Sequence, residues 1–169
     1  MPDFSIEKNF NQSVIGIDEV GRGPIAGPVV SCAFIFFDLL IDNSVLNLIK
    51  DSKELSNKKR VDAYKNILKL KYQNKIKYSL GMASVMEIDK YNILEATKIS
   101  MIRAVKKLKI PASQLIIDGN IDLKLNDYPS KSIVKGDQKS YSIAAASIIA
   151  KIFRDRYMNI ISYKYPFFM

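Results

Sequence analysis

Apolar runs with the character of strands alternate with amphipathic stretches along most of this chain. Four runs rich in β-branched or aromatic residues predict strands at 14–18, 28–37, 114–118 and 131–134. A fifth strand is expected at 75–83, where Ile76, Tyr78 and Leu80 alternate with polar neighbours. Glycines and a proline between the first two runs predict a turn that joins them into a hairpin.

The intervening stretches predict helices. Residues 38–50 are expected to form a loop and a short helix. Ser56 is placed to cap a longer helix whose apolar face carries Val61, Tyr64 and Leu68.

Two further helices follow. Asn92 and Glu95 form a capping-box pattern at the start of the first, which ends before Pro111. One face of this helix is expected to carry Leu94, Thr97, Met101, Val105 and Leu108. The last helix is expected at about 141–160, with Ala145, Ile148, Ile152 and Arg156 at helical spacing.

This order of elements indicates the class of fold. An opening hairpin followed by helices that alternate with strands predicts an α/β domain with a mixed β-sheet flanked by helices. Neither a repeat nor a linker rich in Pro, Gly or Ser divides the sequence, so we expect a single domain over residues 1–169.

Composition narrows the choice of partners. The 169 residues carry a formal net charge of +9, which favours an anionic partner, with nucleic acid first and an acidic membrane surface second. A basic protein that binds neither is the plainer alternative. No apolar run is long enough to span a membrane, and the polar N-terminus is unlike a secretory signal, so a cytoplasmic protein is expected.

Missing residue types exclude several chemistries. The chain has no histidine, which excludes Ser-His-Asp and Cys-His catalysis and His-ligated zinc. Its single cysteine, Cys32, excludes an internal disulfide and fits a small buried hydrophobe. Any enzymatic chemistry must therefore use carboxylates, lysines, tyrosines, hydroxyls or a hard metal ion held by oxygen.

Acidic residues follow three of the predicted strands. They are Asp18 and Glu19 at the end of the 14–18 strand, Asp118 at the end of the 114–118 strand, and Asp137 in the KGD that follows the 131–134 strand. If these ends converge, a cation is needed to offset the repulsion, and an oxygen-rich group without His or Cys suits Mg²⁺ or Mn²⁺. The alternative is that each acid is an ordinary turn or cap residue.

A short glycine-rich element comes directly after the first acid pair. Gly21 and Gly23 allow a ligand to approach the backbone, and Arg22 between them could reach a phosphate. A tight turn with an exposed arginine is the alternative explanation.

Four motifs together resemble the ribonuclease HII family. They are GIDEVGRGPIAGPVV at 16–30, DSKELS at 51–56, IIDGN at 116–120 and VKGDQKSYSIAAASIIAKIFRDR at 134–156. The resemblance implies the ribonuclease H fold and a metal-dependent endonuclease. Such an enzyme would cut the RNA strand of RNA–DNA hybrids, and would cut 5′ of single ribonucleotides in duplex DNA, leaving a 3′-hydroxyl. Ribonucleotide excision and primer removal are the expected roles.

The resemblance also implies the site residues. The family's four metal-binding carboxylates fall on Asp18, Glu19, Asp118 and Asp137, which would hold two ions of Mg²⁺ or Mn²⁺. Asp18 and Asp118 are expected to bridge the ions, and Asp137 to hold the ion of the attacking water. Substrate contacts are expected from the ribose-reading element and from two further residues: Gly21, Arg22, Gly23, Lys53 and Ser140.

Other polar residues have plainer explanations. Asp155, between two arginines, is expected to form a structural ion pair, and Asp51 to position Lys53. Ser140 or Ser142 is expected to cap the last helix and face a DNA phosphate. Lys139 and Lys151 are candidate phosphate contacts.

Three alternatives remain open. The chain ends before a family segment whose tyrosine supports junction recognition, so a catalytically weak or inactive hybrid-binding protein is one of them. A transposase or resolvase of the same fold is another, and ribonuclease HIII, which usually carries an extra N-terminal domain, is the third. We expect a monomer, with a replication clamp as a possible partner.

Overall fold

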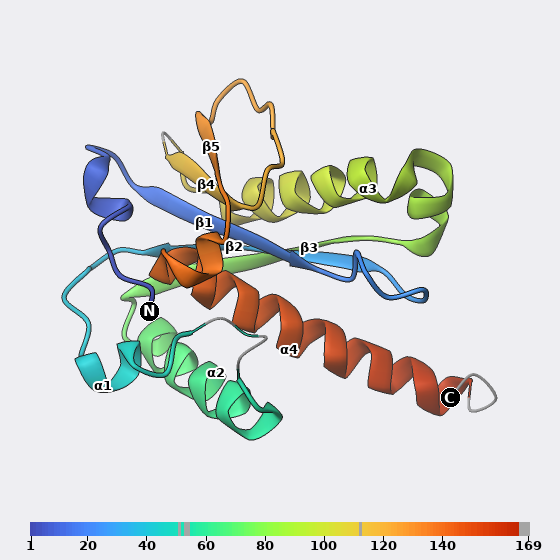
Figure 1. Ribbon diagram of the computed structural model, residues 1–169, viewed down its shortest axis with the longest axis horizontal. Coiled ribbons are helices and arrows are strands. Elements are labelled where there is room, and N and C mark those ends of the chain that lie inside the picture. Colours follow the sequence, from blue (N-terminus) through green and yellow to red (C-terminus); the bar gives the residue numbers. More distant parts are fainter. Residues whose placement is uncertain (51, 53–54, 112, 166–169) are drawn as a thin grey trace.

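The computed structural model describes residues 1–50, 52, 55–111 and 113–165, and its centre is a mixed five-stranded sheet (Figure 1). Its strands are β1 (Val14–Val20), β2 (Val29–Phe36), β3 (Ile76–Ala83), β4 (Gln114–Asp118) and β5 (Ser130–Ile133). The spatial order is β3-β2-β1-β4-β5, in which β1, β2 and β3 are antiparallel and β1, β4 and β5 are parallel. The predicted mixed sheet is confirmed.

Helices cover both faces of the sheet. They are α1 (Asn43–Leu46), α2 (Asn57–Tyr72), α3 (Val85–Leu108) and α4 (Tyr141–Lys164), with short 3₁₀ turns η1 (Glu7–Asn9) and η2 (Gly136–Gln138). Figure 1 shows α3 on one face of the sheet and α4 on the other, with α2 beside α4. None of the helices in the described ranges has the length and apolarity that a membrane span requires.

The sheet separates two apolar clusters. Alternate residues of a strand point to opposite faces, so Ile15 and Ile17 of β1 pack with Met101 and Leu108 of α3. Every position of β2 is buried because it has helices on both sides. Cys32 lies in the cluster beneath α4, as predicted, and burial together with the charge of Asp18 raises the pKa of its thiol.

One glycine sets the distance between α4 and the sheet. A Cβ on Gly16 of β1 would lie within 2.6 Å of the backbone nitrogen of Ile143 in the first turn of α4. Real side chains do not tolerate such a distance, so only glycine lets the helix rest directly on the strand. The start of α4 is therefore fixed against the central strand of the sheet.

The predicted apolar face of α2 was wrong. Val61, Tyr64 and Leu68 are only half-buried, whereas the buried positions are Arg60, Ala63, Ile67 and Leu70. The helix lies mainly against α4, with a smaller contact to β3 of the sheet. Arg60 is buried, and its guanidinium donates to the carbonyls of Ser52 and Leu55. Tertiary packing has rotated the buried face away from the apolar pattern.

The cap predicted at Asn92 is present, but a helical segment precedes it. Ser84 and Glu87 form a complete capping box that starts α3 at Val85. The helix kinks at Asn92, which has φ 67°, and the Asn92 Oδ1 accepts the N–H groups of Leu94 and Glu95. The predicted box partner Glu95 instead pairs with Lys98, at 2.7 Å.

Gly16→Ala should destabilise the protein by about 3 kcal/mol or more, because the added methyl group meets the backbone of α4. Urea unfolding followed by circular dichroism measures the free energy of unfolding. Gly23→Ala is the matched control, since a Cβ there meets nothing within 4 Å. Equal losses in both variants would contradict the close approach.

Candidate active site

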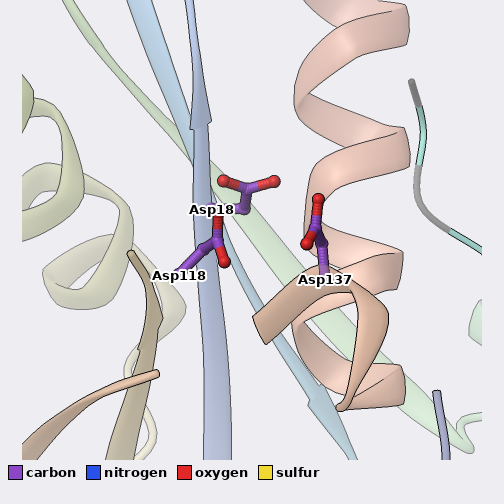
Figure 2. A group of neighbouring side chains, drawn as sticks. All are labelled: Asp18, Asp118 and Asp137. Atoms are coloured by element: carbon purple, nitrogen blue, oxygen red, sulfur yellow. The ribbon is translucent and has the colours of Figure 1, made fainter. Parts of the chain in front are cut away.

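Three aspartates from distant parts of the sequence meet at one end of the sheet. Asp18 lies near the end of β1, Asp118 ends β4, and Asp137 lies in η2 (Figure 2). One carboxylate oxygen from each lies within 4.8 Å of the other two. Asp18 and Asp137 are buried and Asp118 is half-buried. The predicted convergence of these strand ends is therefore confirmed.

The pairing of β1 with β4 produces this convergence. The two strands are parallel neighbours with Ile17 opposite Ile117, so the next residue of each strand carries its carboxylate to the same edge. Parallel strands present their carboxyl ends on one side of a sheet, which is the usual place for a site in open α/β folds.

Gly136 connects Asp118 to the turn that carries Asp137. Its backbone N–H donates to Asp118 Oδ1 at 2.6 Å. The preceding residue, Lys135, has a left-handed backbone with φ 55°, which starts the turn. A Cβ on Gly136 would lie 2.6 Å from Ile143 Cδ1 and 3.3 Å from Asp118 Oδ1, so a larger residue would force the Ile143 side chain to shift. The two aspartates are thus fixed relative to each other through backbone.

The electrostatics of this group favour a bound cation. Burial raises the pKa of Asp18 well above its ordinary value, and the charges of Glu19 and Asp118 raise it further. Hydrogen bonds from the Ser147 hydroxyl and the Glu19 N–H oppose that rise. The donors are all oxygens, and the chain contains no histidine, so the set fits Mg²⁺ or Mn²⁺.

Glu19 is adjacent to Asp18 in the sequence but is not one of the three residues whose carboxylate oxygens lie within 4.8 Å of one another. Its side chain is 15% exposed, and its Oε1 lies 3.5 Å from Nη1 of Arg22. Because its charge raises the pKa of Asp18, it contributes to the same negative field. Its part in holding a metal stays a prediction.

The glycine-arginine-glycine element forms the start of the loop between β1 and β2. Gly21 has φ +109°, a conformation that favours glycine, and Gly23 has open space where a Cβ would be. The Arg22 side chain is 40% exposed. An exposed cation beside open backbone is compatible with the predicted contact with ribose and phosphate.

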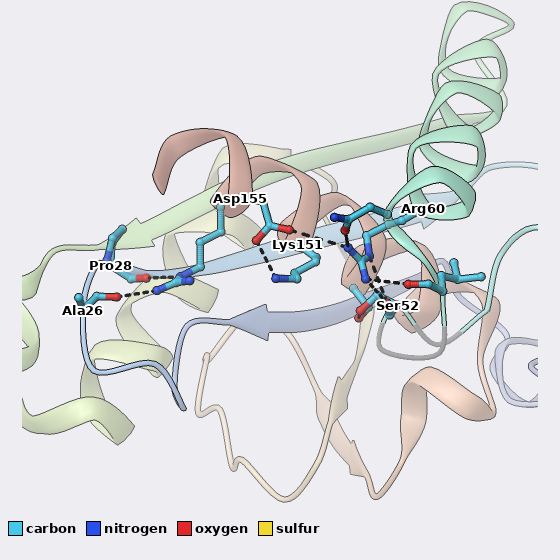
Figure 3. A network of polar contacts seen from close by, with 10 residues as sticks. Ala26, Pro28, Ser52, Arg60, Lys151 and Asp155 are labelled. Atoms are coloured by element: carbon cyan, nitrogen blue, oxygen red, sulfur yellow. Dashed lines mark hydrogen bonds and ion pairs between the residues drawn. The ribbon is translucent and has the colours of Figure 1, made fainter. Parts of the chain in front are cut away.

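Arg154 of α4 anchors this loop and was missed by the sequence analysis. Its Nε donates to the Pro28 carbonyl at 3.0 Å and its Nη2 to the Ala26 carbonyl at 2.8 Å (Figure 3). The guanidinium is buried, and burial lowers its pKa from the ordinary value. Glycines at 21 and 27 leave room for it, because a Cβ at either position would crowd Arg154.

The expected ion pair of Asp155 is confirmed, with different partners. Its carboxylate pairs with Lys151 at 2.6 Å and with Arg60 at 3.8 Å, and not with the flanking arginines. Arg60 in turn donates to the carbonyls of Ser52 and Leu55 (Figure 3). Lys151, a candidate phosphate contact, therefore has a protein partner. The candidates Asp51 and Lys53 lie outside the described residues.

The expected phosphate contact of Ser140 is wrong for this arrangement. Ser140 does cap α4, since its Oγ accepts the Ile143 N–H at 3.2 Å. However, Ser140 is fully buried and its hydroxyl donates to Glu7 Oε1 at 2.7 Å, so it does not face solvent or a ligand there. Ser142 is buried as well, and Lys139 is exposed. Sequence spacing identified the cap but could not show what covers it.

Metal-free protein should lose stability as pH rises through the raised pKa of Asp18. The pKa of this carboxyl is higher in the folded state than in the unfolded state, where it is about 4. Its contribution to stability is therefore fully present below the unfolded-state pKa and is lost as the pH rises through the folded-state pKa. Asp18→Asn should remove this loss and raise the melting temperature at neutral pH by a few degrees. Denaturant unfolding in EDTA from pH 4 to 8 tests it. Asp127→Asn, at an exposed aspartate, is the control. The same pH slope in wild type and Asp18→Asn would refute this electrostatic account.

Arg154→Met should loosen the loop over residues 21–28, because the buried Pro28 carbonyl and the partly buried Ala26 bond lose their donor. The expected cost is about 1–3 kcal/mol, with faster amide hydrogen exchange in this loop. Arg156→Met is the matched control, since Arg156 is exposed and lies over the Tyr64 ring. Unchanged loop exchange in Arg154→Met would show that the guanidinium is not the anchor.

Comparison with known proteins agrees with this geometry. The family model for ribonuclease HII matches residues 15–167. Ribonuclease HII of Orientia tsutsugamushi (strain Ikeda) is 49% identical over 167 residues, covering 98% of this chain and 76% of that protein. Ribonuclease HII of Ehrlichia canis (strain Jake) is 46% identical over 175 residues, covering 98% and 79%.

Solved structures of similar fold support the same assignment. Ribonuclease H2 from Pyrococcus horikoshii OT3 aligns with a TM-score of 0.73 and 27% identity, covering 90% of this chain and 77% of that one. The ribonuclease HII of Archaeoglobus fulgidus, solved in complex with PCNA, gives a TM-score of 0.73 at 25% identity, covering 90% and 78%. Both carry the ribonuclease H-like arrangement of sheet and helices. With three aspartates gathered at one sheet edge and relatives at 46–49% identity over nearly its whole length, this chain belongs to the ribonuclease HII family of metal-dependent endoribonucleases.

Proposed function

We propose that this chain hydrolyses the RNA strand of RNA–DNA hybrids and also cuts on the 5′ side of single ribonucleotides embedded in duplex DNA. The cut would leave a 3′-hydroxyl and use two metal ions. The observation that carries the proposal is the group formed by Asp18, Asp118 and Asp137 in a member of the ribonuclease HII family. Carboxylates gathered at one sheet edge, two of them buried, favour divalent-metal phosphodiester hydrolysis over a structural role.

The metal-holding residues in this proposal are Asp18, Glu19, Asp118 and Asp137. Mg²⁺ or Mn²⁺ bound there would lower the pKa of an attacking water and stabilise the leaving oxygen. A protein of the same fold, Bst-RNase HIII, has been solved in complex with Mn²⁺, which supports testing that ion. In this assignment Asp18 and Asp118 would be ligands shared by the two ions, and Asp137 would hold the ion that activates the water.

The chain's own residues would keep these carboxylates in place. Asp118 is oriented by the Gly136 N–H at 2.6 Å, and Asp18 by the Glu19 N–H at 2.7 Å. Both donors are backbone groups, which cost little reorganisation when the substrate binds. The site would therefore be assembled before any substrate arrives.

Selectivity for RNA is assigned to Gly21, Arg22 and Gly23. Open backbone at Gly23 and the exposed guanidinium of Arg22 would contact the ribose 2′-hydroxyl and the adjacent phosphate. The 2′-hydroxyl is the group that distinguishes RNA from DNA at a given position. Lys53 is proposed from the sequence alone as a contact near the scissile phosphate. The net charge of +9 favours binding to the two phosphate backbones.

Biological roles follow from this activity. We propose ribonucleotide excision and RNA primer removal, by a monomer whose single catalytic domain spans residues 1–169, in the cytoplasm. The Archaeoglobus relative was solved with PCNA, which supports a sliding replication clamp as a partner of this chain too.

Wild-type protein in Mg²⁺ or Mn²⁺ should nick a labelled DNA duplex with one ribonucleotide on its 5′ side, and should cut a long RNA–DNA hybrid. Asp118→Asn should lower kcat by at least about a thousandfold while the fold and hybrid binding persist, because Asn keeps the bond to Gly136 but loses the charge. Gel analysis of cleavage products is the measurement, with all-DNA and all-RNA duplexes as substrate controls.

Each other outcome has a defined meaning. If only the long hybrid is cut, the chain is still an endonuclease for RNA–DNA hybrids, but the proposal that it cuts at single ribonucleotides is wrong. Salt-sensitive hybrid binding without cleavage in either metal would make the chain a catalytically inactive binding protein. Full activity of Asp118→Asn would show that Asp118 is not a metal ligand needed for cleavage.

A further inference from the structure

The first residues of the chain pack against the start of α4. We define the N-terminal arm as residues 3–9, which include η1. Figure 1 shows the arm beside η2 and the first turn of α4. The family model begins to match only at residue 15, so the arm lies outside the matched region. None of the motifs in the sequence assigns it a role.

Glu7 is the polar centre of this contact. It is 5% exposed, and its Oε1 accepts the Ser140 hydroxyl at 2.7 Å and the Ser142 N–H at 3.0 Å. A carboxylate at the N-terminus of a helix is favoured by the free N–H groups and by the helix dipole. Because Ser140 donates to Glu7, its remaining lone pairs accept the Ile143 N–H. Glu7 therefore fixes the orientation of the capping hydroxyl.

Backbone and aromatic contacts hold the arm at the same place. The Asp3 N–H donates to the Lys139 carbonyl at 3.2 Å, and the Tyr141 N–H donates to the Asp3 carbonyl at 3.3 Å. The Phe4 ring lies 4.9 Å from that of Tyr141 and 5.1 Å from that of Phe36, centroid to centroid. The arm is thus held to residues 139–142 by hydrogen bonds and by ring contacts.

A short chain of hydrogen bonds leads from Glu7 to the aspartate group. Ser140, bound by Glu7, donates its N–H to the Gly136 carbonyl at 2.8 Å. Gly136 donates its own N–H to Asp118 Oδ1 at 2.6 Å. Asp137 lies between Gly136 and Ser140 in the same turn. The position of two metal-holding carboxylates therefore depends on the turn that Glu7 holds at its far end.

A helix cap alone does not account for Glu7. Ser140 already supplies the N-cap bond of α4. Among the described residues, Glu7 Oε2 is a buried oxygen without a hydrogen-bond partner, which is a costly state for a carboxylate. Such a cost is typical of a group retained for its effect on a neighbouring site.

We propose that Glu7 is a positioning residue of the metal site, which holds the 136–140 turn so that Asp137 and Asp118 keep their geometry. The proposal rests on the metal site proposed above. Outer residues that orient metal ligands typically change metal affinity or activity by roughly ten- to a hundredfold when removed. The arm is then part of the catalytic apparatus although it supplies no ligand and touches no substrate.

Glu7→Ala should raise the dissociation constant for Mn²⁺ by roughly ten- to a hundredfold and lower kcat on an RNA–DNA hybrid, with little change in KM for the hybrid. The electron paramagnetic resonance signal of free Mn²⁺ measures binding on the intact chain, and initial rates give kcat and KM. Excess Mn²⁺ should restore part of kcat. Glu7→Gln keeps an oxygen that accepts both bonds, so it should lose less.

Glu87→Ala is the matched control, since Glu87 caps the start of α3 and binds Arg103. Both alanine variants should melt earlier, but only Glu7→Ala should change Mn²⁺ affinity, at a temperature where circular dichroism shows both folded. If Glu7→Ala does not fold, Ser140→Ala tests the same link from the other side. Wild-type Mn²⁺ affinity in a folded Glu7→Ala or Ser140→Ala overturns the proposal. Unchanged affinity in Asp118→Asn would instead overturn the metal site itself.

Discussion

The fold holds three like charges together at one end of a sheet, and most of its features serve that requirement. Two unit charges 4 Å apart repel by about 4 kcal/mol at an effective dielectric constant of about 20. That is a large part of the net stability of a small domain. β1 and β4 are buried strands in parallel register, so Asp18 and Asp118 cannot separate without breaking the core. The rigid sheet therefore keeps together charges whose repulsion a bound divalent cation would relieve.

The helix α4 holds the segments around the aspartate group that are not part of the sheet. α4 rests on β1 at Gly16, and its residue Ser147 hydrogen-bonds toward Asp18 and to Ser52. Further along, Arg154 holds the loop after β1, and Asp155 joins Arg60 to α4. These contacts involve segments that are distant in sequence, and they meet because α4 crosses the whole layer beneath the sheet (Figure 1).

Local sequence patterns predicted the elements, and they predicted the aspartates because an acid directly after an apolar strand lies at the sheet edge. Such patterns failed where a residue far away in the sequence determines which side chains are buried or hydrogen-bonded. The buried face of α2 follows from Arg60 entering a turn, and the burial of Ser140 follows from Glu7, 133 positions away. Arg154 looked like a partner of Asp155, yet its carbonyl partners come from 126 and 128 positions earlier. Neither charge alternation nor helical spacing carries that information.

The proposed metal site and the proposed substrate-reading loop are held by two separate parts of α4. The turn with Asp137 ends at Ser140, and Arg154 is 14 residues further along, which is about 21 Å of helix. Contacts at the first end act on carboxylate geometry, whereas contacts at the second act on the glycine-arginine-glycine loop. Because the two anchors share no side chain, we expect a change at either one to disturb one of the proposed functions with little coupling to the other. The helix fixes the distance between the two anchors, so under the proposed function a single rigid element would keep the cleaved bond in register with the ribose that identifies it.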